Sequence, residues 1–270
     1  VAAKHITDLT YADDIALLAS SFADAQLMLN HIEHWALTVG LRINRKKTEY
    51  MTFGDWSRQP QQGLNLSTGE VLSTLDFKYL GCWIKSTQQN LSVRIAMAWA
   101  AAKRMRKVWN SDIGRPLRVA LFKATVETVL LYGAETWTLT QAHSKKLDGT
   151  YTKLLRYIFQ RHWSEHLTNA ELYDDLPKVS TRVKRSKLTF AGHCYRATDQ
   201  LVSELVFLQR PTERFYQGQQ FTTTYEKSIL ADLGTYMGVH DSEYIANDII
   251  NVQKLMSDRE RWIEKVQKIV

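Results

Sequence analysis

The chain lacks the residues and runs that mark several common classes of protein. Only two of its 270 residues are cysteines, Cys82 and Cys194, and they form no Cys-x-x-Cys unit. We therefore expect neither a disulfide framework nor a zinc ribbon, and a reducing intracellular compartment fits best. No apolar run approaches the roughly 20 residues that cross a bilayer. The first apolar run is interrupted by Lys4, His5 and Asp8, so we expect no signal peptide and no membrane partner.

Several catalytic signatures are also missing. The sequence contains no glycine-rich phosphate loop, no dinucleotide fingerprint and no Ser-His-Asp pattern. A zinc site could be imagined from His162, His166, His193 and Cys194, but the Cys-x-x-Cys half that anchors such sites is absent, and surface or helix-end histidines are the expected outcome. What the chain does have is a formal charge of +7 and a pI of about 9.3, which favour a polyanionic partner.

The most informative string is Tyr11-Ala12-Asp13-Asp14. Residues 6–11 alternate loosely between apolar and polar side chains, and residues 15–19 are apolar, so the pattern predicts two strands with the aspartates at or near the turn. Neighbouring carboxylates repel each other, and two hard oxygen ligands are typical of a Mg²⁺ site that also uses substrate phosphates. A metal there could clamp the attacking and leaving oxygens of a phosphoryl transfer.

Other interpretations of this string are open at this point. A motif this short also arises by chance. One aspartate could instead form an Asx turn and cap a helix through Ala16 and Leu17. Tyr11 could simply be a half-buried strand aromatic.

The remaining pattern predicts an α+β chain in which strands come first and helices follow. A helix is expected over 21–39, ending at Gly40, with strands over 50–53 and 64–84 and a loop over 54–63. Further helices are expected over 91–109, 116–131, 142–160 and 179–195, with capping boxes that begin at Thr168 and Ser257. Residues 210–250 show few strong periods.

Basic side chains gather at three places that are candidate contacts for a phosphate backbone. They are Arg45-Lys46-Lys47, then Lys103, Arg104, Arg106 and Lys107, then Arg182, Lys184, Arg185 and Lys187. A solvated surface is the ordinary alternative for any one of them. Trp99, Trp109 and Tyr157 lie nearby and could stack on bases, although their apolar stripes favour a core position for the tryptophans.

Taken in order, these strings resemble the C-terminal part of a non-LTR (LINE-type) retrotransposon reverse transcriptase of the RTE-like branch. Residues 11–14 look like its catalytic Asp-Asp hairpin, residues 40–48 look like its motif D with the characteristic Lys-Thr, and residues 77–81 look like its primer-grip hairpin. Residues 154–156, 163, 166–169, 176–177, 190–196 and 255–262 resemble the region after the thumb and the last helix of that branch.

The resemblance implies roles for particular residues. Asp13 would coordinate two catalytic Mg²⁺ ions, with Mn²⁺ as the alternative ion, and Asp14 would support or share that role. Lys47 would protonate the leaving pyrophosphate or steady its charge, against the alternative of a solvated basic loop. The side chains expected to line the nucleotide and the primer end are Tyr11, Tyr79, Leu80 and Gly81.

The same resemblance implies a domain organisation and partners. We expect a partial palm of antiparallel hairpins plus a helix over 1–85, a helical thumb over 86–161 and a mostly helical C-terminal extension over 162–270. The partners would be an RNA template and a DNA primer, and the retrotransposition step would take place in the nucleus.

The family has a further metal-binding aspartate and its fingers upstream of the Asp-Asp hairpin, and ten residues before Tyr11 leave no room for them. We therefore expect a fragment of a longer protein that does not polymerise by itself and whose half-palm exposes apolar side chains. Two alternatives remain: a non-catalytic nucleic-acid-binding remnant of a decayed or co-opted element, or a structural module in which Asp13→Asn changes no Mg²⁺ binding.

Overall fold

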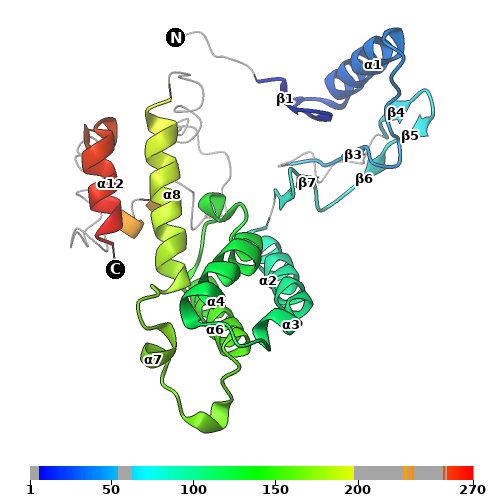
Figure 1. Cartoon of the computed structure of the whole chain (residues 1–270). Helices are drawn as coiled ribbons and strands as arrows, with labels where there is room; N and C mark the ends of the chain where they lie inside the picture. The colour runs from blue at the N-terminus through cyan, green and yellow to red at the C-terminus, as the bar shows by residue number, and fades with distance from the viewer. Residues whose placement is uncertain are drawn as a thin grey trace. The chain divides into compact units, whose positions relative to one another are not determined.

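The computed structural model describes residues 6–53, 63–84, 86–197, 228–229, 231–233, 252 and 254–269 (Figure 1). The chain divides into two compact units, which we call the N-terminal unit (Val1–Ser86) and the C-terminal unit (Thr87–Val270). Short strands and one helix build the first, and helices build the second, so the fold class is α+β as expected. The expected loop over 54–63 and the poorly patterned stretch over 210–250 lie almost wholly outside the described residues.

The N-terminal unit begins with the hairpin that the sequence predicted. Strand β1 (Asp8–Tyr11) pairs antiparallel with β2 (Asp14–Leu17), and Tyr11 lies opposite Asp14. The helix-cap interpretation of the aspartates is wrong, because Ala16 and Leu17 belong to a strand. Asp13 and Asp14 therefore sit at the tip of a two-stranded ribbon.

Helix α1 (Phe22–Thr38) follows, and its ends agree with the sequence. The Ser21 hydroxyl accepts a hydrogen bond from the Asp24 backbone N–H at 3.0 Å, which satisfies one of the free amides of the first turn. Gly40 has φ +78° in the left-handed region that helix ends favour. The apolar side chains of α1 are only partly buried, since Leu29 is buried whereas Trp35 is 66% exposed.

The other strands of this unit are two residues long. The pair β3 (Glu49–Tyr50) and β6 (Leu72–Ser73) is parallel, and the hairpins β4 (Asn65–Leu66) with β5 (Gly69–Glu70) and β7 (Lys78–Tyr79) with β8 (Cys82–Trp83) are antiparallel. The strand expected over 50–53 thus ends at Tyr50. Leu72 follows the β4–β5 hairpin and pairs with β3, a long-range pairing that local periodicity does not reveal.

The core of the N-terminal unit is small. Its buried side chains are Leu29, Leu64, Leu66 and Val71. Many large apolar side chains of the unit stay in contact with solvent, and Val39 and Leu75 are 69% and 77% exposed. The expected exposure of apolar side chains in this part of the chain is thus observed.

The C-terminal unit is built from helices, shown in green to red in Figure 1. They are α2 (Thr87–Arg104), α3 (Arg106–Trp109), α4 (Arg115–Phe122), the π-helical segment Lys123–Glu127, α5 (Thr128–Leu130), α6 (Gln141–Ile158), α7 (Asn169–Tyr173), α8 (Val179–Tyr195) and α12 (Arg259–Gln267), with 3-10 turns at Ala134–Thr136 and Trp163–Glu165. The helix expected over 91–109 is interrupted at Met105, which separates α2 from α3. Within the described ranges, none of the helices has both the length and the apolar character that a bilayer crossing requires.

Two apolar clusters hold this unit together. The larger one joins α2, the α4–α5 region, α6, α7 and the start of α8 around buried Trp109, Phe122 and Tyr151. The smaller one joins the rest of α8 to α12, where the buried Trp262 indole N–H donates to the Leu188 carbonyl at 2.9 Å. Figure 1 shows α12 running beside α8.

Both predicted capping boxes mark real helix starts, but only one has the predicted residue. Thr168 caps α7 and bonds reciprocally with Glu171, as expected. At α12 the capping side chain is Asp258 and not Ser257, because Asp258 accepts from the Arg261 backbone N–H at 3.1 Å. The predicted position was therefore wrong by one residue.

Candidate active-site hairpin and nucleic-acid interface

The carboxylates of Asp13 and Asp14 are exposed at the tip of the β1–β2 hairpin. Ala12 and Asp13 make the two-residue turn, and Ala12 has φ +54°, the positive value that tight hairpin turns demand. Among the described residues, neither carboxylate has a hydrogen bond or an ion pair with another side chain. Tyr11 is 66% exposed on the same ribbon, so the interpretation of its ring as half-buried is wrong.

A second hairpin is tied to the first. The Tyr79 hydroxyl in β7 donates to the Leu9 carbonyl in β1 at 3.2 Å. Leu80 and Gly81 form the turn between β7 and β8 with φ +47° and +80°. The structure thus brings the predicted primer-end residues of the second hairpin to the strand that carries Tyr11, a link across 70 residues that no local pattern signals.

The hairpin supplies two acidic ligands and no third. No group of three or more His, Cys, Asp or Glu side chains that could hold a metal ion occurs in the part of the chain that the structure describes. The four residues considered for zinc, His162, His166, His193 and Cys194, lie within the described part and form no such group. Cys194 is buried, and burial raises the pKa of its thiol.

Lys47 lies in a compact turn that Asn44 organises. The Asn44 carbonyl accepts from the backbone N–H groups of Lys47 and Thr48 at 2.9 and 3.0 Å, and its side-chain oxygen accepts from the Lys46 N–H. An asparagine just before a polar cluster is a usual signal for such a turn, although sequence reasoning did not use it here. The Lys47 side chain projects into solvent from this turn.

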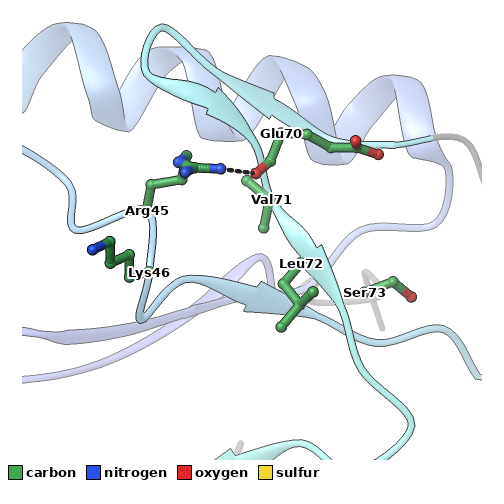
Figure 2. A pocket seen from close by; sticks show the side chains of 6 residues that line it. All are labelled: Arg45, Lys46, Glu70, Val71, Leu72 and Ser73. Atoms are coloured by element: carbon green, nitrogen blue, oxygen red, sulfur yellow. Dashed lines mark hydrogen bonds between the residues drawn. The ribbon is translucent and has the colours of Figure 1, made fainter.

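Arg45 and Lys46 line one side of an open cavity of about 450 Å³ (Figure 2). Glu70, Val71, Leu72 and Ser73 line the other side. The Arg45 guanidinium donates to the Glu70 carbonyl at 3.2 Å, which anchors it to β5. Two cations therefore face a cavity whose opposite wall is mostly backbone and apolar side chain.

The second predicted basic cluster is open to solvent. Lys103 and Arg104 end α2, and Arg106 and Lys107 begin α3. All four are exposed, and none has an ion pair within the described ranges. Trp109 is buried and donates to the Ala102 carbonyl at 2.8 Å, and Trp99 packs edge-on against Tyr157, so the expected core role of the tryptophans is confirmed.

The third predicted basic cluster does not form an open cationic face. Lys187 is 3% exposed and ion-paired with Asp232, and Lys184 also contacts Asp232 at 3.7 Å. Arg182 pairs with the buried Glu127, and Arg185 donates to the Ile269 carbonyl at 2.7 Å. Because Lys187 is buried and ion-paired, its interpretation as a phosphate contact is corrected, whereas Arg182, Lys184 and Arg185 are partly exposed and their contact with nucleic acid stays a prediction.

The Glu127 pair belongs to a network that sequence reasoning missed. Tyr151 donates to the Glu127 carboxylate at 2.5 Å inside the core. Burial, reinforced by the Glu127 charge, raises the pKa of Tyr151 well above its usual range. A lone glutamate within the apolar pattern of 115–130 is the one signal that could have pointed to it.

The match to known families agrees with this geometry. Residues 2–84 match the family described as reverse transcriptase (RNA-dependent DNA polymerase). The Asp13–Asp14 hairpin, the Lys47 turn and the Tyr79 hairpin therefore lie in one reverse transcriptase domain, a class that generally uses divalent metal ions and acts on a template and a primer.

A relative adds information on the origin of the chain. A putative uncharacterized transposon-derived protein of Caenorhabditis elegans is 30% identical over 220 residues, which cover 77% of this chain and 78% of that protein. The chain belongs to this family of transposon-derived proteins with a reverse transcriptase domain. No solved structure matches the chain at a significant level.

Proposed function

We propose that the chain is the part of a non-LTR (LINE-type, RTE-like) retrotransposon reverse transcriptase that runs from the catalytic hairpin of the palm onward. Its parent would synthesise DNA on an RNA template from a DNA primer by two-metal nucleotidyl transfer. The observation that carries the proposal is the exposed Asp13–Asp14 pair at the tip of the β1–β2 hairpin. Tyr79 ties this hairpin to the β7–β8 hairpin. For such a reaction we propose the nucleus as the place of action.

The donor chemistry of this hairpin fits a divalent cation. Asp13 and Asp14 offer hard carboxylate oxygens that no described side chain occupies, and Mg²⁺ prefers one or two carboxylates with the rest of its shell from water and phosphate. Mn²⁺ shares this preference for oxygen ligands. When bound, such an ion would stabilise charge on the attacking and leaving oxygens.

The surrounding residues would bind and orient the substrates. Tyr11 and the Leu80–Gly81 turn would bound the space for the primer end and the incoming nucleotide. Lys47 would place its ammonium near the leaving pyrophosphate, where it could donate a proton or stabilise charge. Arg45 and Lys46 would attract the phosphates toward the cavity of Figure 2.

We propose that these 270 residues do not polymerise by themselves. A two-metal site needs tightly fixed ligands, and the described residues supply two carboxylates at the hairpin without a third group. Primer extension with the purified chain, an RNA template, a DNA primer and Mg²⁺ should therefore give no incorporation above background. Incorporation that Asp13→Asn abolishes would contradict the proposed incompleteness and still support the catalytic role of the hairpin.

The second candidate is a non-catalytic nucleic-acid-binding remnant of a decayed or co-opted element. The exposed cations at the α2–α3 junction, which have no ion pair with any described residue, favour it, because they can contact phosphate whatever the state of the catalytic site. The coding frame upstream of Val1 separates the two. An open frame that encodes fingers and another palm aspartate supports the enzyme, and a stop codon or an unrelated domain supports the remnant.

A further inference from the structure

The C-terminal unit contains a second cavity, distant in sequence from the catalytic motifs, whose walls are cationic. It has a volume of about 320 Å³ and lies between the end of α3 and the end of α6. Arg106 and Trp109 line it from α3 and Asn110 from the cap of that helix, while Arg156 and Tyr157 line it from α6, and Gln160, Arg161 and His162 line it from the segment that follows α6. Ligand pockets begin at about 300 Å³, so this one is of a size for a single small unit.

Arg118 links the two walls of the cavity through hydrogen bonds. The Arg118 guanidinium donates to the Trp109 carbonyl at 2.9 Å and to the Ile158 carbonyl at 2.7 Å, one from each helix end. It also donates to the carbonyls of Ser111 and Ile113. Helix C-termini ordinarily repel anions because of their free carbonyl groups, and here Arg118 satisfies two of those groups.

Few carboxylates compete with a ligand for the cations that line the cavity. Arg106 is exposed and makes no ion pair with any described residue. Arg161 pairs with Glu165 at 3.1 Å and is still about half exposed. The pKa of Glu165 is lowered by the hydrogen bond from the His162 backbone N–H and by Arg161, so this carboxylate stays charged beside Arg161.

The polar groups between the cations suit a base and not only a phosphate. Gln160 donates to the Asn110 amide oxygen at 2.5 Å, which leaves the Asn110 amide nitrogen and the Gln160 amide oxygen for a ligand. One donor beside one acceptor matches the edge of a nucleobase. Tyr157 adds an aromatic side chain to the same wall, and such side chains support bases in single-strand sites.

We propose that this pocket binds one unpaired nucleotide of an RNA or DNA strand, with Arg106 and Arg161 at the phosphate and the Asn110–Gln160 amides at the base. The bases of a blunt duplex are paired and stacked, whereas an unpaired base can leave the strand and enter a pocket. The inference is independent of catalysis at Asp13 and Asp14, because it needs neither a divalent ion nor the N-terminal unit.

The test is fluorescence anisotropy of the full chain with a short labelled single-stranded RNA and with a blunt RNA duplex, at low salt and with EDTA present. Arg106→Gln and Arg161→Gln should each weaken single-strand affinity by about 5- to 10-fold and duplex affinity by less than about 2-fold, in line with loss of one specific cationic contact. Arg106→Lys should recover part of the loss, and Glu165→Gln should tighten binding because it removes the charge that competes for Arg161.

The matched control is Lys103→Gln, which removes an equally exposed cation outside the pocket and should affect single strand and duplex alike. Because EDTA removes any divalent ion from the Asp13–Asp14 hairpin, the result does not depend on that site, and failure of the polymerase proposal would leave it intact. Equal losses for Arg106→Gln and Lys103→Gln on both nucleic acids would overturn the proposal. Photocrosslinking of RNA containing 4-thiouridine should label the segments 106–110 or 156–162, and labelling confined to other segments would also overturn it.

Discussion

At the scale of single residues, Gly192 in α8 lies against the indole of Trp262 with no room for a side chain. A Cβ at Gly192 would meet the Trp262 Nε1 at a distance that real Cβ atoms do not reach. Both residues are buried, and the indole N–H already donates to Leu188. Any side chain at this position must therefore displace α12 or break that hydrogen bond.

Gly192→Ala should lower the free energy of unfolding by about 2–4 kcal/mol, from overpacking together with the disturbed hydrogen bond. Gly149→Ala in α6 is the matched control, because a Cβ there meets no atom within 4 Å. It should raise stability by about 0.5–1 kcal/mol through the better helix propensity of alanine. Thermal unfolding followed by circular dichroism measures both, and a neutral Gly192→Ala would contradict the packing described.

Tyr151 should make the folding stability of the protein fall at alkaline pH. Burial and the Glu127 charge raise the pKa of its phenol in the folded state, whereas the unfolded chain ionises near pH 10. The stabilising contribution is therefore complete below about pH 10 and is lost as the pH rises above it. Tyr151→Phe should make the fall in melting temperature above pH 10 shallower, and Tyr11→Phe, which changes an exposed ring, should not. An identical alkaline slope in Tyr151→Phe would contradict this cause.

At the scale of elements, α8 shows how a basic pattern can mislead. Its Lys187 lies against Asp232 and donates to the Ser228 hydroxyl at 3.0 Å, so the ammonium is used for packing. Asp232→Asn leaves this cation buried without its counter-charge and should cost about 3–5 kcal/mol. The double variant Lys187→Met with Asp232→Leu should recover most of that loss in urea denaturation.

Lys187→Met alone should leave RNA affinity unchanged, and a marked loss of affinity would restore the surface interpretation.

Features set by neighbouring residues could be predicted from the sequence, whereas features set by distant partners could not. The Asp13–Asp14 hairpin, the end of α1 at Gly40 and the cap at Thr168 follow from chemistry within a few residues, and the structure confirms them. The burial of Lys187 depends on a partner 45 positions along the chain, and the Tyr79–Leu9 bond crosses 70. Periodicity cannot identify such partners, because it records only which face is apolar.

The cavity between α3 and α6 was missed for the same reason. Arg106 is recognisable from the sequence as part of a basic cluster, but the approach of Arg156 in α6 and of Arg161 just after α6, about 50 positions later, is not. The Arg118 contacts that hold the two helix ends together are made with backbone carbonyls, which leave no signature in the sequence.

At the scale of the whole molecule, the two units differ in how much apolar surface they bury. Among the described residues, the C-terminal unit has two buried clusters, whereas the N-terminal unit has four buried apolar residues and several exposed ones such as Trp35 and Leu75. Few buried contacts mean low resistance to local opening. Hydrogen exchange should therefore be faster in α1 and the β-hairpins than in α2 and α6 by orders of magnitude. Equal protection in both units would contradict this difference in packing.

The central claim is that Asp13 and Asp14 form a divalent-metal site of a reverse transcriptase domain. Its most direct test is the broadening of backbone amide NMR signals of the full chain by substoichiometric Mn²⁺, compared among the wild type, Asp13→Asn and the surface control Asp112→Asn. We predict broadening centred on residues 11–15 that Asp13→Asn abolishes and Asp112→Asn preserves. Broadening that spares the hairpin, or that survives Asp13→Asn unchanged, would contradict the account.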